Sequence, residues 1–174
     1  MSALHDTLLL LVPSGLSVCQ LPLPTSVARE SVQVSTRSVL DLNSAHAGDH
    51  LVSCSDSTIC VASRNVAWVA LNQGTSISRS KFAWKQFNLP QQITSLDCAN
   101  DTLAIGDRSG NIRLYFDLSE STKKDKLPTE SIINWHQSPV SSLRFSHSGK
   151  TLLILSFSYL QVCFLSREAG KMFW

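Results

Sequence analysis

A strand, a short polar turn and a second strand recur along the chain, and this repeat limits the possible folds more than any other feature. Each copy has a threonine near the start of its first strand, and successive threonines lie 51, 44 and 49 residues apart: Thr7, Thr58, Thr102 and Thr151. The strands are short apolar runs separated by Ser, Asn, Asp, Gly and Pro, a pattern typical of sheets with tight turns. Helical periodicity is almost absent, so the sequence predicts an all-β protein.

A repeat of this length matches one blade of a β-propeller, a four-stranded sheet that buries its faces only by stacking on neighbouring blades. We expect an incomplete β-propeller with two full and two partial blades, near residues 1–45, 46–88, 89–136 and 137–153. Closed propellers have about four to eight blades. Because an incomplete ring leaves sheet edges and faces open, we expect the isolated chain to be poorly soluble.

The third unit is the best formed of the four. Its strands are expected at residues 93–98, 102–106, 111–116 and 130–135. A tight turn joins the second strand to the third, and its glycine is free to adopt the positive φ that such turns need. This turn contains Asp107 and Gly110.

The third unit resembles the WD-repeat pattern. Asp107 occupies the position of that family's turn aspartate, and residues 110–115 resemble its Gly-x-Ile-x-Leu-Trp segment. The unit departs from the pattern where Tyr115 replaces tryptophan, where the next residue is Phe rather than Asp, and where Trp135 replaces glycine before His136. An aromatic residue at the end of the third strand can still pack between blades. The resemblance implies that five residues stabilise the blade: Asp107, Gly110, Tyr115, Trp135 and His136.

Within the WD-repeat proteins, residues 105–115 and 134–143 are similar to the nucleolar WD-repeat-containing protein 75 family. The similarity covers about residues 80–153, whereas residues 1–79 share only the blade pattern. It implies a non-enzymatic scaffold of the nucleus and nucleolus that acts in ribosome biogenesis. The implied partners are other WD-repeat proteins of the small-subunit processome, with precursor ribosomal RNA or the U-three small nucleolar RNA. The alternative is a generic WD-repeat adaptor for protein binding in another complex.

A group of basic residues lies in the connection before the fourth strand of the third unit. The lysines are Lys123, Lys124 and Lys126, and they are candidates for contact with RNA phosphate or with a partner protein. The competing interpretation is a solvated loop that only increases solubility. The net charge of +2 is too close to zero to indicate nucleic-acid binding by the chain as a whole.

Motifs for catalysis and for metal binding are not found in the sequence. It has no Gly-x-Ser-x-Gly, no Walker loop, no His-Glu-x-x-His and no cluster of paired carboxylates. The five cysteines are an odd number without a secretory signal, which favours a reducing compartment, and none has a zinc-binding spacing. We therefore predict no enzymatic activity, no cofactor or metal and no small-molecule substrate. Because the apolar runs are shorter than a bilayer requires, we also predict no membrane partner.

Residues 154–174 depart from the repeat. The segment 154–165 stands where the family would continue with a Ser-Gly-Gly turn, and residues 166–174 resemble the delayed end of the same blade. We expect residues 154–165 to be an insertion, such as translated intron sequence, and the alternative is a divergent strand. Members of the family are far longer, so the resemblance also implies that this chain is a partial or truncated form.

Overall fold

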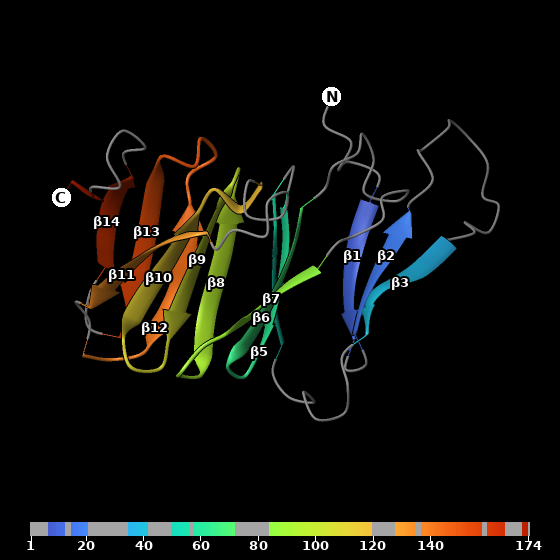
Figure 1. Cartoon of the computed structure of the whole chain (residues 1–174), viewed down its shortest axis with the longest axis horizontal. Coiled ribbons are helices and arrows are strands. Elements are labelled where there is room, and N and C mark those ends of the chain that lie inside the picture. The colour runs from blue at the N-terminus through green and yellow to red at the C-terminus, as the bar shows by residue number, and fades with distance from the viewer. Residues whose placement is uncertain are drawn as a thin grey trace.

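The computed structural model describes residues 7–12, 15–20, 35–41, 50–55, 58–71, 84–119, 128–134, 137–157, 160–165 and 172–173. Apart from Leu118 and Ser119, which have helical geometry, the regular structure of these residues is β-strand. The strands form four antiparallel sheets in which consecutive strands are hydrogen-bonded neighbours. Figure 1 shows the sheets following one another in chain order along the long axis. This arrangement is that of an incomplete propeller, as the repeat predicts.

The four sheets correspond to the four repeats. The first sheet contains β1 (Thr7–Val12), β2 (Gly15–Gln20) and β3 (Ser35–Asp41). The second contains β4 (His50–Cys54), β5 (Thr58–Ser63), β6 (Val66–Leu71) and β7 (Trp84–Asn88). The third contains β8 (Ile93–Ala99), β9 (Thr102–Asp107), β10 (Asn111–Phe116) and β11 (Thr129–Asn134), each within one residue of the strand predicted from the sequence. The fourth contains β12 (Val140–Phe145), β13 (Thr151–Ser156), β14 (Leu160–Leu165) and β15 (Met172–Phe173).

The fourth sheet differs from the sequence expectation, because it continues beyond Leu153 and has four strands rather than a partial set. β13 extends to Ser156, and β14 lies wholly within residues 154–165 and pairs with β13 over most of its length. The side chains of Ile154 and Cys163 are fully buried. The segment expected to be an insertion is therefore a pair of strand segments with apolar residues directed into the core. Its origin stays a prediction, because pairing and burial do not depend on it.

Two apolar layers hold the second, third and fourth sheets together. Successive side chains of a strand point to opposite faces, so the residues of β9 alternate between the two layers. The layer between the second and third sheets includes Cys60, Ala62, Leu103, Ile105 and Tyr115. The layer between the third and fourth sheets includes Ala104, Ile112, Leu114, Leu152 and Ile154. Burial of each fully buried Leu or Ile side chain in these layers contributes about 1.5–3 kcal/mol to the free energy of folding.

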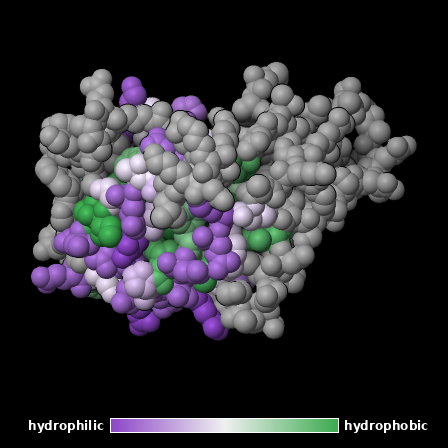
Figure 2. Space-filling view, viewed as in Figure 1, coloured by the Kyte–Doolittle hydropathy of each residue, from purple (hydrophilic) through white to green (hydrophobic). Residues whose placement is uncertain are grey.

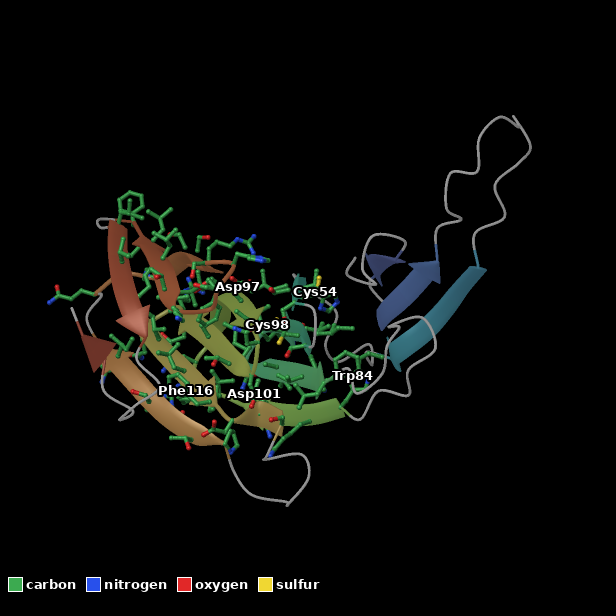
Figure 3. The ribbon with its side chains drawn as sticks, turned by 90° about the horizontal axis from the view of Figure 1, so that it is seen from above. Cys54, Trp84, Asp97, Cys98, Asp101 and Phe116 are labelled. Carbon is green, nitrogen blue, oxygen red and sulfur yellow. The ribbon has the colours of Figure 1, made fainter. Side chains whose placement is uncertain are left out.

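The first strands of these three sheets, β4, β8 and β12, lie next to one another (Figure 3). The Thr94 hydroxyl on β8 donates a hydrogen bond of 2.7 Å to the carbonyl oxygen of Val140 on β12. On β9, a Cβ atom at Gly106 would lie 2.6 Å from the Val140 Cβ and 2.4 Å from the Ser95 Oγ. Only glycine fits at this position, because the fourth sheet approaches the backbone of the third so closely.

Candidate functional site

Two hairpin turns and one connection meet at one edge of the second and third sheets. The turns join β5 to β6 and β9 to β10, and the connection joins β7 to β8. We call six of the exposed polar residues at this edge the turn rim: Arg64, Asn65, Gln91, Gln92, Arg108 and Ser109. None of the six is acidic and two are arginines, so the formal charge of these six residues is positive. Figure 2 shows the described surface in one orientation as mainly hydrophilic, with small apolar patches.

Backbone hydrogen bonds fix the turn rim. The Leu89 amide donates to the Asn65 carbonyl oxygen at 2.8 Å, and the Arg108 amide donates to the Gln92 carbonyl oxygen at 2.9 Å. The Arg108 guanidinium also donates to the Gln92 side-chain oxygen at 3.2 Å. Arg64 adopts a φ of 53°, an uncommon conformation for a residue with a side chain, in the turn between β5 and β6. The arginines are therefore presented from an ordered backbone.

Asp107 holds the β9–β10 turn that carries Arg108. Its carboxylate accepts hydrogen bonds from the Ser109 amide at 2.8 Å, the Asn111 amide at 3.0 Å and the Asn111 side-chain amide at 3.0 Å. Gly110 in the same turn has a φ of 87°, the positive value that the sequence predicts there. Asp107 is 1% exposed, so its carboxylate is enclosed within the turn and is not displayed at the surface beside Arg108.

A second carboxylate connects three sheets at their inner strands (Figure 3). Asp97 on β8 accepts a hydrogen bond of 2.5 Å from the Ser53 hydroxyl on β4 and one of 2.6 Å from the Phe145 amide on β12. The Arg144 guanidinium lies 3.5 Å from the same carboxylate. Asp97 is 7% exposed. It is thus a buried acceptor shared by the second and fourth sheets, and sequence analysis does not identify it as a site residue.

The hairpin tips at the opposite ends of the strands are also joined. The Thr58 hydroxyl donates to the Asn100 carbonyl oxygen at 2.8 Å. The Asn100 side-chain amide in turn donates to the Ser148 carbonyl oxygen at 3.1 Å. These two bonds link the second, third and fourth sheets in sequence, so the three sheets are tied at the tips as well as at the inner strands.

Tyr115, in the position where the WD-repeat pattern has tryptophan, lies in the layer between the second and third sheets. Its ring centroid is 4.9 Å from that of Phe87, with the ring planes tilted by 47°. The neighbouring ion pair joins the Arg113 guanidinium to the Glu130 carboxylate at 2.9 Å. Burial, with the nearby charge of Glu130 as a further cause, raises the pKa of Tyr115 to about 12. The phenol is therefore neutral at physiological pH and acts as a packing residue.

The raised pKa of Tyr115 predicts a loss of stability in strong alkali. Because the folded state favours the neutral phenol, its contribution is complete below the ordinary tyrosine pKa of 10 and is lost as the pH rises towards about 12. We expect the free energy of unfolding to fall more steeply above pH 10 in the parent chain than in Tyr115→Phe. Urea titrations at a series of pH values measure this difference. Equal slopes for the two proteins would contradict the assignment.

Two buried thiols also lie between the second and third sheets. The Cys98 thiol is 3.6 Å from the Thr58 carbonyl oxygen and 3.8 Å from the Ser53 hydroxyl. Burial raises the pKa of the Cys60 thiol well above its usual value, so this thiol is unreactive at neutral pH. Among the residues that the structure describes, no three His, Cys, Asp or Glu side chains are grouped so as to hold a metal ion. In the same part of the chain, no helix has the length and hydropathy needed to span a membrane.

Five of the candidate residues named from the sequence lie outside the described residues. They are Lys123, Lys124 and Lys126, the proposed contacts for RNA or a partner, and Trp135 and His136, the pair that resembles the Gly-His position of the WD repeat. The structure brings Asp107 and Gly110 together in one turn and places Tyr115 in the adjacent apolar layer.

Comparison with known proteins gives one family match and a structural similarity. Residues 30–62 match the family model described as "WD domain, G-beta repeat". This segment includes β3, β4 and most of β5, and it lies outside residues 80–153, where the resemblance in the sequence is clearest. No curated protein sequence matches the chain. The matched segment therefore lies in the part of the chain where sequence analysis finds only the blade pattern.

Among solved structures, a chain of the "Crystal Structure of Mitotic Checkpoint Complex" is similar to this one, with a TM-score of 0.59 and 14% sequence identity. The similarity covers 95% of this chain and 46% of that chain, so this chain spans less than half of the other's length. At this identity the similarity shows the fold alone, which is that of the incomplete propeller described above. Neither comparison singles out the WD-repeat-containing protein 75 family.

Proposed function

We propose that this chain is a non-enzymatic WD-repeat scaffold in ribosome biogenesis, where it assembles with other WD-repeat proteins of the small-subunit processome in the nucleolus. The general role as a protein-interaction scaffold is supported by the WD repeat at residues 30–62 and by the stacked sheets. The specific role is supported by the similarity of residues 105–115 and 134–143 to one nucleolar family. The observation that carries the scaffold role is the turn rim, a charged surface on a fixed backbone, and the processome role rests on the sequence similarity alone.

The turn rim is suited to binding acidic groups. Arginine presents several donors in one plane and binds carboxylate or phosphate with two parallel hydrogen bonds. Arg64 and Arg108 stand on turns that both bond to the β7–β8 connection, so a partner can contact them together. We propose acidic segments of processome proteins as the main partners, and precursor ribosomal RNA or U-three small nucleolar RNA as further partners. Lys123, Lys124 and Lys126 are proposed as additional contacts.

The alternative is a generic WD-repeat adaptor in another complex. The fold, the turn rim and the WD repeat fit this role equally well, because none of them depends on the identity of the partner. The two proposals differ in what they predict for the RNA that accompanies the chain.

Affinity capture of the tagged chain from nuclear extract separates the two proposals. We expect enrichment of U-three small nucleolar RNA and of WD-repeat processome proteins, with the tagged chain located in the nucleolus by microscopy. Capture of a stable set of proteins without that RNA would overturn the processome role and leave the adaptor role.

The turn rim itself is tested by charge reversal. We expect Arg64→Glu and Arg108→Glu each to reduce capture of the partners about tenfold at physiological salt, because each change replaces an attractive contact with a repulsive one. Lys150→Glu is the matched control, since Lys150 is exposed in the β12–β13 turn at the opposite end of the sheets. An equal loss in the control would show that net charge, and not the turn rim, governs binding.

A further inference from the structure

Two thiols from neighbouring sheets lie in the apolar layer between the second and third sheets. Cys60 is on β5 of the second sheet, Cys98 is on β8 of the third, and the two are 38 residues apart in the chain. Their side chains are 0% and 4% exposed. Figure 3 labels Cys98 on the inner strand of the third sheet. Both residues lie towards the hairpin tips, at the end of the strands opposite to the turn rim.

The contacts of the Cys98 sulfur place it beside Cys60. Its Sγ atom lies 3.8 Å from the Ser53 Oγ and 3.6 Å from the Thr58 carbonyl oxygen. Ser53 is the residue of β4 directly opposite Cys60, so these two side chains point to the same face and their Cα atoms are about 4.5–5.5 Å apart. Thr58 precedes Cys60 by two positions on β5 and therefore has the same orientation. Cys98 thus contacts the neighbours of Cys60 on two sides.

The environment gives the two thiols different acidities. A hydrogen bond from the Cys60 thiol lowers the pKa of Cys98, although burial acts in the opposite direction. Burial raises the pKa of Cys60 well above its usual value, and the hydrogen bond to Cys98 is a further cause. Cys98 is therefore the thiol that more readily becomes a thiolate, the nucleophilic form of cysteine, while Cys60 keeps its proton.

We propose that Cys60 and Cys98 form a reversible disulfide, a redox modification site that joins the second sheet to the third, with a hydroperoxide as the oxidant. The Cys98 thiolate attacks one peroxide oxygen, the O–O bond breaks, and Cys98 becomes a sulfenic acid. The leaving hydroxide takes up the proton that the Cys98 thiol released, which gives the first water. The Cys60 sulfur then attacks the Cys98 sulfur, the S–O bond breaks, and the Cys60 proton passes to the leaving oxygen to give the second water.

The position of Cys98 in the third sheet gives a small oxidant a short route to its sulfur. β8 ends at the next residue, Ala99, and Asn100 at the hairpin tip is exposed. Opening of this tip alone uncovers Cys98, whereas Cys60 lies further inside the layer. Because the cysteine usage favours a reducing compartment, where disulfides are typically transient and redox-sensing, we expect the bridge to be reduced again by cellular dithiols.

Peptide mapping by mass spectrometry tests this disulfide in the full chain. The folded chain is treated with hydrogen peroxide, then unfolded, alkylated and digested. We expect a linked pair of peptides that contains Cys60 and Cys98, and a loss of two alkylated thiols. The intact mass before alkylation should fall by about 2 Da, because the bridge removes two hydrogen atoms. Dithiothreitol should reverse these changes.

Substitutions of single cysteines test the order of the two steps. In Cys60→Ala, we expect oxidation to stop at the sulfenic acid of Cys98, which dimedone labels. In Cys98→Ala, we expect Cys60 to remain fully alkylated, since its pKa is raised. Cys163→Ala is the matched control, because Cys163 is a fully buried thiol in the other apolar layer, and it should form the bridge as the parent does. Circular dichroism establishes that each variant is folded.

The parent chain alone can overturn the proposal. Full alkylation of both Cys60 and Cys98 after peroxide treatment would do so, as would a bridge from Cys98 to Cys54, which is exposed at the end of β4. Equally fast formation of the bridge in chain unfolded by urea would also overturn it, because the folded contacts would then contribute nothing. The disulfide does not depend on the partner proposed for the turn rim.

Discussion

Replacing Asp97 with alanine is expected to lower the free energy of unfolding by about 3 kcal/mol. The substitution leaves the Ser53 hydroxyl and the Phe145 amide, which donate to this carboxylate at 2.5 and 2.6 Å, without their acceptor in a buried position. Because the two donors belong to different sheets, the loss weakens both contacts of the third sheet at once. Asp97→Asn should lose less, about 2 kcal/mol, because its amide oxygen still accepts one of the two bonds. Urea unfolding monitored by circular dichroism measures both values.

Glu130→Gln provides the comparison for Asp97. Glu130 forms an ion pair with Arg113 at 2.9 Å, but its side chain is 39% exposed. An exposed ion pair contributes about 0–1 kcal/mol, so we expect little change. If the substitutions at Asp97 and Glu130 lowered the free energy of unfolding by similar amounts, the result would contradict the assignment of Asp97 as the acceptor that joins the sheets.

The third sheet could be predicted almost completely from the sequence, because local patterns specify it. The turn residues Asp107 and Gly110 separate two alternating apolar runs, and the side chain of Asp107 bonds only to residues two and four positions ahead. The partners of Asp97 could not be found in this way. Ser53 and Phe145 lie 44 and 48 residues away in the chain, and no spacing rule connects them.

In the fourth sheet, the resemblance to the WD-repeat family and the alternation of apolar residues predict different structures after Leu153. The family pattern predicts a turn after Leu153, but Leu152, Ile154 and Ser156 alternate with more exposed residues in the way of a strand. The segment forms a strand, because the alternation of side chains along a strand directs Leu152 and Ile154 into the core. The same alternation directs Leu153 and Leu155 to the opposite face. On that face each of these two leucines is 43% exposed, whereas Leu152 and Ile154 are fully buried.

The sequence predicts the separate turns of the turn rim but not that they lie together. Arg64 and Arg108 are both recognisable as turn residues, and each turn follows from its own flanking strands. Their convergence depends on the β7–β8 connection, whose backbone bonds to both turns. A charged surface that combines residues of two repeats leaves no pattern within either repeat. The sequence therefore indicates the loop with Lys123, Lys124 and Lys126 as a binding candidate, because its charges are adjacent in the chain.

Replacing Leu114 with alanine is expected to lower the free energy of unfolding by about 2–5 kcal/mol. Leu114 is fully buried in the layer between the third and fourth sheets, so its truncation leaves a cavity that the neighbouring side chains fill only in part. Leu103→Ala, in the layer on the other side of the third sheet, should cost a similar amount. Leu153→Ala is the control, because that side chain is 43% exposed on β13 and its removal leaves no cavity.

The two core variants also test whether the stacked sheets unfold as one unit. β9 and β10 contribute to both apolar layers, and Asp97 on β8 bonds to the sheets on either side. We therefore expect Leu103→Ala and Leu114→Ala each to shift a single transition to lower urea concentration without changing its slope. A second transition that appears only in Leu114→Ala would mean that the fourth sheet unfolds on its own. In that case the stability of one apolar layer would not depend on the other, and the fourth sheet would be a folding unit separate from the sheets that carry the turn rim.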